Sequence, residues 1–187
     1  MSERAPRSGR KPPGFFAAAP LNRKPRNLVG ELQDQGYAAF SAPERSHTDG
    51  KGSCQATLYY HTRGSGRAKH MPIVKSGDGH AEVQAVSEFV RQKCSYRLDL
   101  YAEYQAAGIG MKCQEKAVCR KCATFLGLMG IDHYDEHTTK CRDGMDMTQW
   151  EMPHDLRKFF LEYLQVRYPA DAANITSELV HQFITTV

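Results

Sequence analysis

The sequence of 187 residues predicts an α/β fold, in which a mixed sheet of about five strands is flanked by helices, with extra helices at the C-terminal end. Short runs rich in β-branched and aromatic residues, bounded by glycines, indicate the strands. Between and after them lie segments whose apolar residues recur at helical spacing. The end of the chain holds two long segments of this second kind, and they predict the extra helices.

Composition divides the chain into a basic, proline-rich tail or linker at 1–45 and a folded domain at 46–187. Residues 1–26 carry a charge of +6, because Glu3 stands against seven basic residues: Arg4, Arg7, Arg10, Lys11, Arg23, Lys24 and Arg26. The whole chain carries +4, so the remainder carries +4 minus +6, or −2. We expect a disordered or extended tail, serving as a solvated linker or as a source of phosphate contacts. The nearly neutral remainder does not indicate a large phosphate-binding face.

Two β-rich runs precede the first helical pattern. Residues 56–62 form one, and a turn at Gly64–Gly66 separates it from a second short strand at 71–75. We expect these strands to pair as a hairpin. A Gly-Asp-Gly turn then leads into a helix that begins at His80. Its valines have the spacing of a helix packed on a sheet, and they are Val83, Val86 and Val90.

The middle of the chain predicts one more strand and a second helix. Apolar and polar residues alternate from 97 to 104, which is typical of a half-buried strand. We interpret the glycine-rich stretch 106–110 as an inserted loop. A helix follows from Cys119 to about Met129, with Gly130 as its C-terminal stop.

The last part of the chain predicts two weak strands and then two helices. The strands, at 131–137 and 145–151, flank an Arg-Asp-Gly turn and would form an antiparallel hairpin. Pro153 opens the first helix, and Asn174, after Pro169, caps the second. We interpret the apolar stripes of both helices as core packing against the sheet. The alternative makes the final helix a docking surface for a partner protein.

The residues with the clearest chemistry stand where two helices start. A catalytic zinc takes three nitrogen or sulfur ligands and keeps an open position for water, and His80 with Cys119 and Cys122 supplies that set. Cysteines three apart at a helix start share one face, near N–H groups that favour negative charge. Glu82 does not share the direction of His80 on a regular helix, so it is better placed to carry protons than to bind the metal. The sequence predicts Zn²⁺ at these ligands and Glu82 as the catalytic acid/base.

These residues resemble the zinc-dependent cytidine deaminase superfamily, whose signature is His-x-Glu followed by Pro-Cys-x-x-Cys. The chain matches at His80, Glu82, Cys119 and Cys122, and departs at Val118, where the family usually has proline. The resemblance implies a three-layer sandwich and the hydrolysis of cytosine to uracil. The basic tail and added C-terminal helices make the chain most similar to bacterial toxin-type deaminases. That similarity implies nucleic acid as the substrate, DNA rather than RNA, and admits a neutralising immunity protein as a partner.

The candidate substrate contacts are aromatic or basic side chains near these motifs: Tyr60, His61, Arg120, Lys121 and Tyr134. Aromatic rings can stack on an unpaired base. The two basic residues between the zinc cysteines are placed for a phosphate, and their alternative role is that of solvated residues on a first helical turn. The resemblance also implies that backbone groups near two further positions orient the base, Ala81 and Val118.

Two other functions stay open. One is deamination of a free nucleoside, nucleotide or other small amine. The other is a noncatalytic binding module, in which Cys113 and Cys141 join Cys119 and Cys122 around a closed structural zinc.

The cysteine usage and the lack of apolar segments suggest where the protein acts. Six cysteines without regular spacing indicate a reducing compartment. No segment has the pattern of a signal peptide or of a membrane-spanning helix. We expect a cytoplasmic site of action without membrane association, and specialised secretion stays open as the delivery route.

Overall fold

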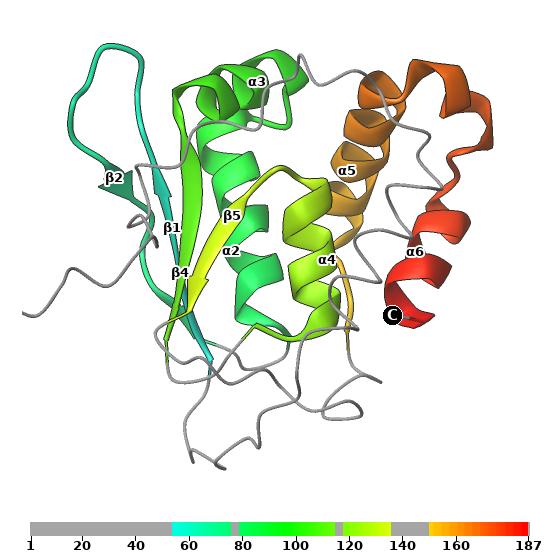
Figure 1. The fold of residues 1–187 in the computed structure, drawn as a ribbon, viewed down its shortest axis with the longest axis horizontal. Helices are drawn as coiled ribbons and strands as arrows, with labels where there is room; N and C mark the ends of the chain where they lie inside the picture. Colours follow the sequence, from blue (N-terminus) through cyan, green and yellow to red (C-terminus); the bar gives the residue numbers. More distant parts are fainter. Residues whose placement is uncertain (1–53, 76–78, 115–117, 136–149, 187) are drawn as a thin grey trace, which may run out of the picture.

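The computed structural model describes residues 54–75, 79–114, 118–135 and 150–186, and the first of its elements form one mixed sheet (Figure 1). The sheet has five strands in the order β2-β1-β4-β5, and β3 also pairs with β1. This confirms the predicted α/β class and the mixed sheet of about five strands. The strands are β1 (Gln55–Tyr60), β2 (Lys69–His70), β3 (Val74–Lys75), β4 (Ile109–Gln114) and β5 (Asp132–Asp135).

β1 lies at the centre of the pairing. It is antiparallel to β2, β3 and β4, and the β1–β4 register runs from Gln55↔Gln114 to Tyr60↔Ile109. β4 and β5 are parallel. The predicted antiparallel pairing of the run 71–75 with the first strand is confirmed for β3, whereas residues 71–73 are not in a strand and β2 lies before the predicted bounds.

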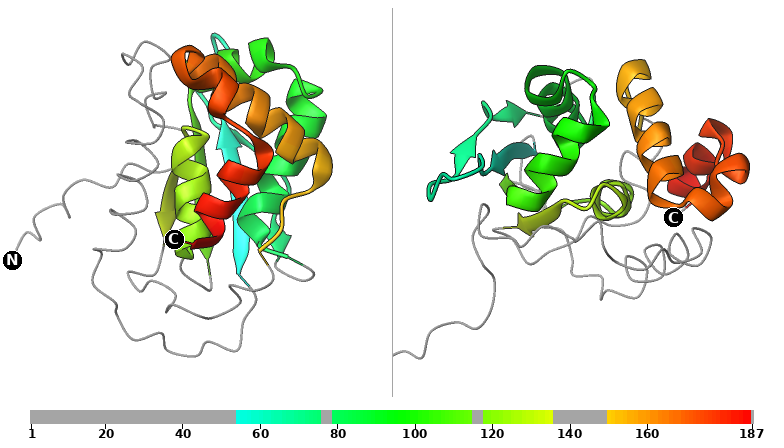
Figure 2. Two further views of the ribbon diagram at one scale, coloured as in Figure 1. Left: turned by 90° about the vertical axis from the view of Figure 1, so that its right-hand side faces the viewer. Right: turned by 90° about the horizontal axis from the view of Figure 1, so that it is seen from above.

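The described helices all lie on the same side of the sheet (Figures 1 and 2). Next to the sheet are α2 (Ala81–Phe89), which the π-helix η1 (Val90–Cys94) extends, and α4 (Arg120–Leu128). α3 (Leu98–Ala107) follows η1 at one end of the sheet. Further out lie α5 (His154–Arg167), the 3-10 helix η3 (Pro169–Asn174) and α6 (Ser177–Thr186). The predicted extra C-terminal helices are thus present.

The core forms between the sheet and α2. Alternate residues of β1 face the helices, and the last of them, Tyr60, packs its ring against Phe89 of α2 and Tyr104 of α3, with centroids 5.5 Å apart in both cases. Val83 and Val86 are also buried, as the helical spacing predicted. Burying apolar surface of this kind contributes about 25 cal/mol per Å² and fixes α2 on the sheet.

The prediction of a strand at 97–104 is wrong, because these residues form most of α3. Tyr101 and Gln105, one helical turn apart, are the buried residues of this helix. The Tyr101 hydroxyl and the Gln105 amide both donate hydrogen bonds to the Met129 carbonyl, at 2.7 and 2.8 Å. The alternation of apolar and polar residues suggested a strand because α3 is half-buried on several sides, so its apolar residues do not form one clear stripe at helical spacing.

The inserted loop predicted at 106–110 is also wrong. α3 ends at Ala107, and β4 starts at Ile109 and forms the sheet's longest pairing with β1. Gly108 joins them with φ of 124°, a conformation that residues with a side chain rarely adopt. The glycine-rich composition therefore marks a sharp helix-to-strand turn rather than an insertion.

The apolar stripe of α5 packs in the core, but its ring contacts are with other helices, whereas the sequence predicted packing against the sheet. Phe159 and Phe160 pack against Tyr101 of α3 and Phe125 of α4, with ring centroids 5.5 and 5.3 Å apart. The predicted cap at Asn174 is wrong, because that residue ends η3. The Leu179 amide instead donates to the side-chain hydroxyl of the residue before α6, Thr176.

Some predictions fall outside the described residues. They are the basic tail at 1–45, the turn at 142–144 and residues 145–149 of the last predicted strand. Trp150 and Glu151, which complete that segment, are not in a strand. Among the helices that the structure describes, none has the length and apolar character needed to cross a membrane.

Candidate metal centre

The ligand residues predicted from the sequence meet at one end of the sheet. α2 and α4 both begin at this end, where β4 finishes. His80 is the residue that caps α2 and Cys119 is the residue that caps α4, and both have extended backbone conformations. Each side chain therefore leaves the chain where the helix begins, which brings positions 39 residues apart into contact.

His80, Cys119 and Cys122 form a compact group. The His80 Nδ1 atom lies 3.4 Å from the Cys119 Sγ and 3.4 Å from the Cys122 Sγ. All three ligand atoms lie within 4.8 Å of one another, and both cysteines are buried. No other group of three such side chains meets this criterion among the described residues.

These distances fit a tetrahedral zinc ion. With Zn–S near 2.3 Å and Zn–N near 2.05 Å, tetrahedral angles place a sulfur and a nitrogen ligand about 3.6 Å apart. The observed separations of 3.4 Å differ from this by less than the tolerance of such sites. The group supplies three ligands, so a metal held by it would keep a fourth position for another molecule.

The two thiols have different electrostatic environments. Hydrogen bonding with Cys122 and with His80 holds the pKa of Cys119 well below its usual range. The backbone N–H of Cys122 also donates to the Cys119 Sγ, at 3.4 Å, which favours the thiolate. Burial instead raises the pKa of Cys122. A bound cation would offset that penalty, because metal ligation requires deprotonated sulfur.

Glu82 lies beside the ligand group and is buried, with 2% of its surface exposed. Its Oε2 accepts a hydrogen bond from the Cys122 thiol at 3.5 Å. Burial, with the nearby Cys119 charge as the next cause, raises the pKa of this carboxyl to about 7. A carboxyl with this pKa exchanges protons readily near neutral pH. The sequence predicted that Glu82 would lie beside the ligands without binding the metal. Glu82 is not one of the three residues of the ligand group.

Cys54 is a neighbour of the site that the sequence did not reveal. It directly precedes β1, is buried, and its thiol donates to the Glu82 Oε1 at 3.5 Å. The two carboxylate oxygens of Glu82 are thus held by two different cysteines. A lone cysteine before a strand has no sequence pattern that would indicate this contact.

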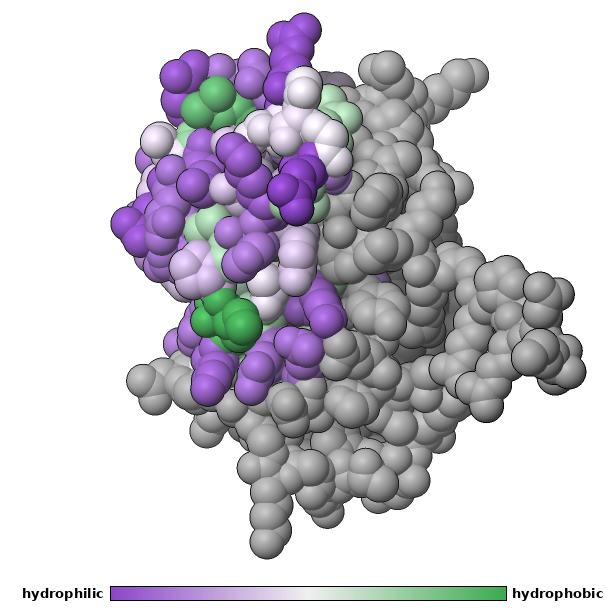
Figure 3. Space-filling model, turned by 90° about the vertical axis from the view of Figure 1, so that its left-hand side faces the viewer, coloured by the Kyte–Doolittle hydropathy of each residue, from purple (hydrophilic) through white to green (hydrophobic). Residues whose placement is uncertain are grey.

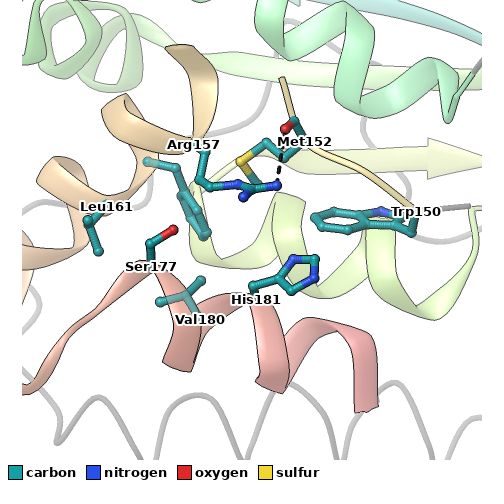
Figure 4. A pocket seen from close by; sticks show the side chains of 8 residues that line it. Trp150, Met152, Arg157, Leu161, Ser177, Val180 and His181 are labelled. Carbon is teal, nitrogen blue, oxygen red and sulfur yellow. Dashed lines mark hydrogen bonds between the residues drawn. The ribbon is translucent and has the colours of Figure 1, made fainter. Parts of the chain in front are cut away.

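Trp150 is a second such neighbour. Its indole is buried against Phe125 of α4, with ring centroids 6.1 Å apart. Its N–H lies near enough to Cys122 to lower the pKa of that thiol, although among the described residues no acceptor lies within hydrogen-bond geometry of this N–H. Because an indole N–H can only donate, it favours the thiolate form of this sulfur. Figure 4 shows the other side of the ring lining a small apolar pocket with α5 and α6, near His181. None of the three ligand residues lines that pocket.

The structure brings only some of the expected substrate contacts to the ligand group. Ala81 is the first residue of α2, and Val118 directly precedes Cys119, so both lie beside it and both are buried. Tyr60 and His61 stand at the other end of β1, about 17 Å away for a six-residue strand. The structure does not bring these two rings to the candidate metal centre.

The remaining expected contacts lie on α4 and β5. Arg120 begins α4 and Tyr134 lies in β5. Lys121 is only 2% exposed, and burial lowers its pKa while the charges of Cys119 and Cys122 raise it. A side chain with so little exposed surface does not have the environment of a solvated residue on a first helical turn.

The structure also bears on the alternative of a closed zinc site. Cys113 lies in β4 opposite Ala56 and is buried, and it does not belong to the described ligand group. The fourth proposed ligand, Cys141, lies outside the described residues. Within the part of the chain that the structure describes, the histidine rather than Cys113 completes the set.

Comparison with known proteins adds no relative. No family model matches the chain, and no match was found among curated proteins or among solved structures. The class that fold and site define is therefore an α/β protein with a mixed sheet and a His-Cys-Cys group placed to bind a metal ion.

Proposed function

We propose that this protein is a zinc-dependent hydrolytic deaminase that converts cytosine to uracil in nucleic acid, DNA rather than RNA, in the manner of bacterial toxin-type deaminases. One observation carries the proposal. A buried carboxyl, Glu82, adjoins a His-Cys-Cys group that supplies three metal ligands and to which the described residues add no fourth. The resemblance of these four residues to the cytidine deaminase signature supports the same reading.

The protein's own residues have distinct tasks in this reaction. His80, Cys119 and Cys122 would hold the zinc, which when bound acts as a Lewis acid and lowers the pKa of water to about 7. Glu82 takes a proton from the attacking water and delivers it to N3 of the base. Water oxygen bonds to C4, and Glu82 passes the second water proton to the amino group. The C4–N4 bond then breaks, so that cytosine and water give uracil and ammonia.

Burial explains why Glu82 suits this task. An exposed glutamate has a pKa near 4.5 and returns protons poorly at neutral pH, whereas burial raises that of Glu82 to about 7. The thiol of Cys54 fixes one carboxylate oxygen at 3.5 Å, which limits rotation of the group. A carboxyl held in one orientation can serve both proton transfers without a new arrangement of the site.

A deaminase of a free nucleoside or other small amine is the second candidate. The near neutrality of the chain beyond residue 26 favours it, because a large phosphate-binding face is not indicated by that charge. Both candidates use the same chemistry at the same residues. They differ in whether the base must be part of a polymer.

The test compares Glu82→Gln with a matched variant on the same helix, Glu88→Gln, in the full chain. Glu88 is on α2 as well, but it is exposed and bonded to Arg91 and Gln92. We expect Glu82→Gln to retain zinc and lose deamination by a factor of at least about 10², and Glu88→Gln to retain both. Loss of zinc or of the fold in Glu82→Gln, or retained activity, would contradict the assigned role.

The substrate is tested by offering cytidine, single- and double-stranded DNA, and RNA, and by sequencing or chromatographing the products. Uracil in an oligonucleotide supports the first candidate. Uridine from cytidine alone would replace it with the second. If none of these substrates yields uracil or uridine while zinc is bound, the cytosine deaminase proposal fails, and a noncatalytic zinc module becomes the better account.

A further inference from the structure

The hairpin that connects β1 to β2 carries a concentration of positive charge. Residues 54–75 contain two arginines, two lysines and two histidines, and no aspartate or glutamate. We call the exposed basic side chains at the β1–β2 end of this segment the basic hairpin surface: Arg63, Arg67, Lys69 and His70. Lys75 is not part of it, because β3 pairs it with Gln55 at the other end of β1. Figure 3 looks at the molecule from this side and shows mainly hydrophilic side chains among the described residues.

Among the described residues, no ion pair involves the arginines and the lysine of this surface, Arg63, Arg67 and Lys69. Two arginines elsewhere on the surface differ from these, because Arg91 and Arg97 each bind a carboxylate, at 2.6 Å. Unneutralised positive charge on one face is the electrostatic pattern of a surface that receives phosphates.

The backbone holds the hairpin tip away from the body of the protein. The Ser65 amide donates to the Thr62 carbonyl at 2.9 Å, which closes a turn with Gly64 at φ of 79°. A methyl group built at Gly64 or at Gly66 would contact nothing within 4 Å. No described residue therefore occupies the space on the side-chain side of these two glycines, so a polymer can approach the tip there without displacing described residues.

An aromatic pair adjoins the charges. Tyr59 of β1 and His70 of β2 are cross-strand partners, with ring centroids 5.6 Å apart. Tyr60, the next residue, packs on the helices, so by strand alternation Tyr59 lies on the opposite face of the sheet. Partly exposed rings beside basic side chains are the combination with which proteins bind single-stranded nucleic acid without reading its sequence.

We propose that the basic hairpin surface binds the sugar–phosphate backbone of single-stranded nucleic acid, several nucleotides from the base that enters the candidate metal centre. This inference rests on the proposed function and adds a place where the polymer binds. The hairpin and the ligand group stand at opposite ends of β1, about 17 Å apart along the strand. At the roughly 3.4 Å per nucleotide of stacked bases, this distance corresponds to about five nucleotides, and an extended single strand spans it with fewer.

The test removes two hairpin charges with Arg63→Gln/Arg67→Gln. The control, Arg91→Gln/Arg97→Gln, changes the net charge equally but removes arginines that are paired with Glu88 and Asp99. Both full-length variants are compared with the unchanged chain by fluorescence anisotropy, using labelled single-stranded DNA and RNA of about 30 nucleotides. The basic tail is common to all three proteins, so differences among them report on the substituted residues.

We expect the hairpin variant to bind roughly tenfold more weakly near physiological salt, and its slope of log K against log salt to fall by about 1.4. These figures follow from about 0.7 counterions released per phosphate contact on a single strand. The control should keep the slope of the unchanged chain. Zinc content and deamination of free cytidine should be the same in all three, because neither uses the hairpin.

An equal effect in both variants would overturn the proposal, because it would show a general field rather than local contacts. Unchanged binding in the hairpin variant would overturn it too. Loss of binding to an acidic polypeptide such as polyglutamate, with DNA and RNA binding intact, would assign the surface to a protein partner instead. If binding depends on the hairpin but no substrate is deaminated, the proposal that this surface binds nucleic acid stands and only the proposed deaminase function is refuted.

Discussion

Replacing Glu82 by glutamine should stabilise the metal-free protein at alkaline pH. The pKa of Glu82 rises from 4.5 to about 7 because the carboxyl is buried, with the charge of Cys119 as the next cause. A group whose folded-state pKa is raised contributes stability that is fully present below 4.5 and is lost as the pH rises through about 7. The difference between the two pKa values corresponds to about 3 kcal/mol.

The measurement is urea unfolding of the chelator-treated chain at pH 5 and at pH 8. With a slope of about 2 kcal/mol per M, the loss of about 3 kcal/mol lowers the unfolding midpoint of the unchanged protein by about 1.5 M between these values. Glu82→Gln has no carboxyl to ionise, so its midpoint should lack this part of the decrease. Other titrating groups contribute to both proteins, and the comparison between them isolates Glu82.

The control and the metal sharpen this test. Hydrogen bonding to Arg91 lowers the pKa of Glu88, so its contribution to stability is lost only as the pH falls below the ordinary glutamate range. Glu88→Gln should therefore follow the unchanged chain between pH 5 and 8. Adding zinc should reduce the advantage of Glu82→Gln, because a nearby cation favours the ionised carboxyl. The same decrease in Glu82→Gln as in the unchanged chain would refute the reasoning.

Three further outcomes are expected. Cys54→Ala should lower kcat about fivefold, because the hydrogen bond from this thiol to Glu82 contributes about 1 kcal/mol. Cys54→Ser should recover most of the lost kcat, because a hydroxyl can donate the same bond. Equal losses of kcat in the two variants would exclude positioning of Glu82 by this contact. Cys122→Ala should lose zinc, measured as metal per chain, while Cys113→Ala retains it, and the reverse would favour the closed site. Tyr101→Phe should lower the unfolding free energy by about 1 kcal/mol, and an unchanged urea midpoint would contradict the value of that buried hydrogen bond.

Local chemistry made the two metal-site helices predictable. His80 and Cys119 each cap a helix, and the apolar spacing behind each residue is regular enough to fix its direction. The segment 98–107 was not predictable in this way, because α3 has few fully buried residues and its long contacts determine its structure. Met129, which accepts two of those hydrogen bonds, stands 24 and 28 residues away from its donors. Reading a short stretch of sequence cannot reveal a contact between residues so far apart in the chain.

The residues of the candidate site also fall into two groups, those that local sequence predicts and those that only the fold reveals. Its proposed ligands and proposed proton carrier follow from residue type and spacing, because metal chemistry demands few kinds of side chain. Cys54 and Trp150 did not follow, because their roles depend on where β1 and the segment before α5 lie relative to α2 and α4. A residue that acts through its neighbour becomes visible only when the fold places it.

Charge separates the two regions that the proposed function needs. A zinc ion with two thiolates would be neutral, and the charge of an ionised Glu82 is offset by that of Lys121 beside the cysteines, so the centre carries little net charge and suits an uncharged base. The basic hairpin surface, whose arginines and lysine have no ion pair among the described residues, lies at the far end of β1. Salt should therefore raise KM for an oligonucleotide, because it competes with the hairpin contacts, and leave turnover of free cytidine nearly unchanged. A salt effect of equal size on both substrates would mean that charge acts at the metal centre itself.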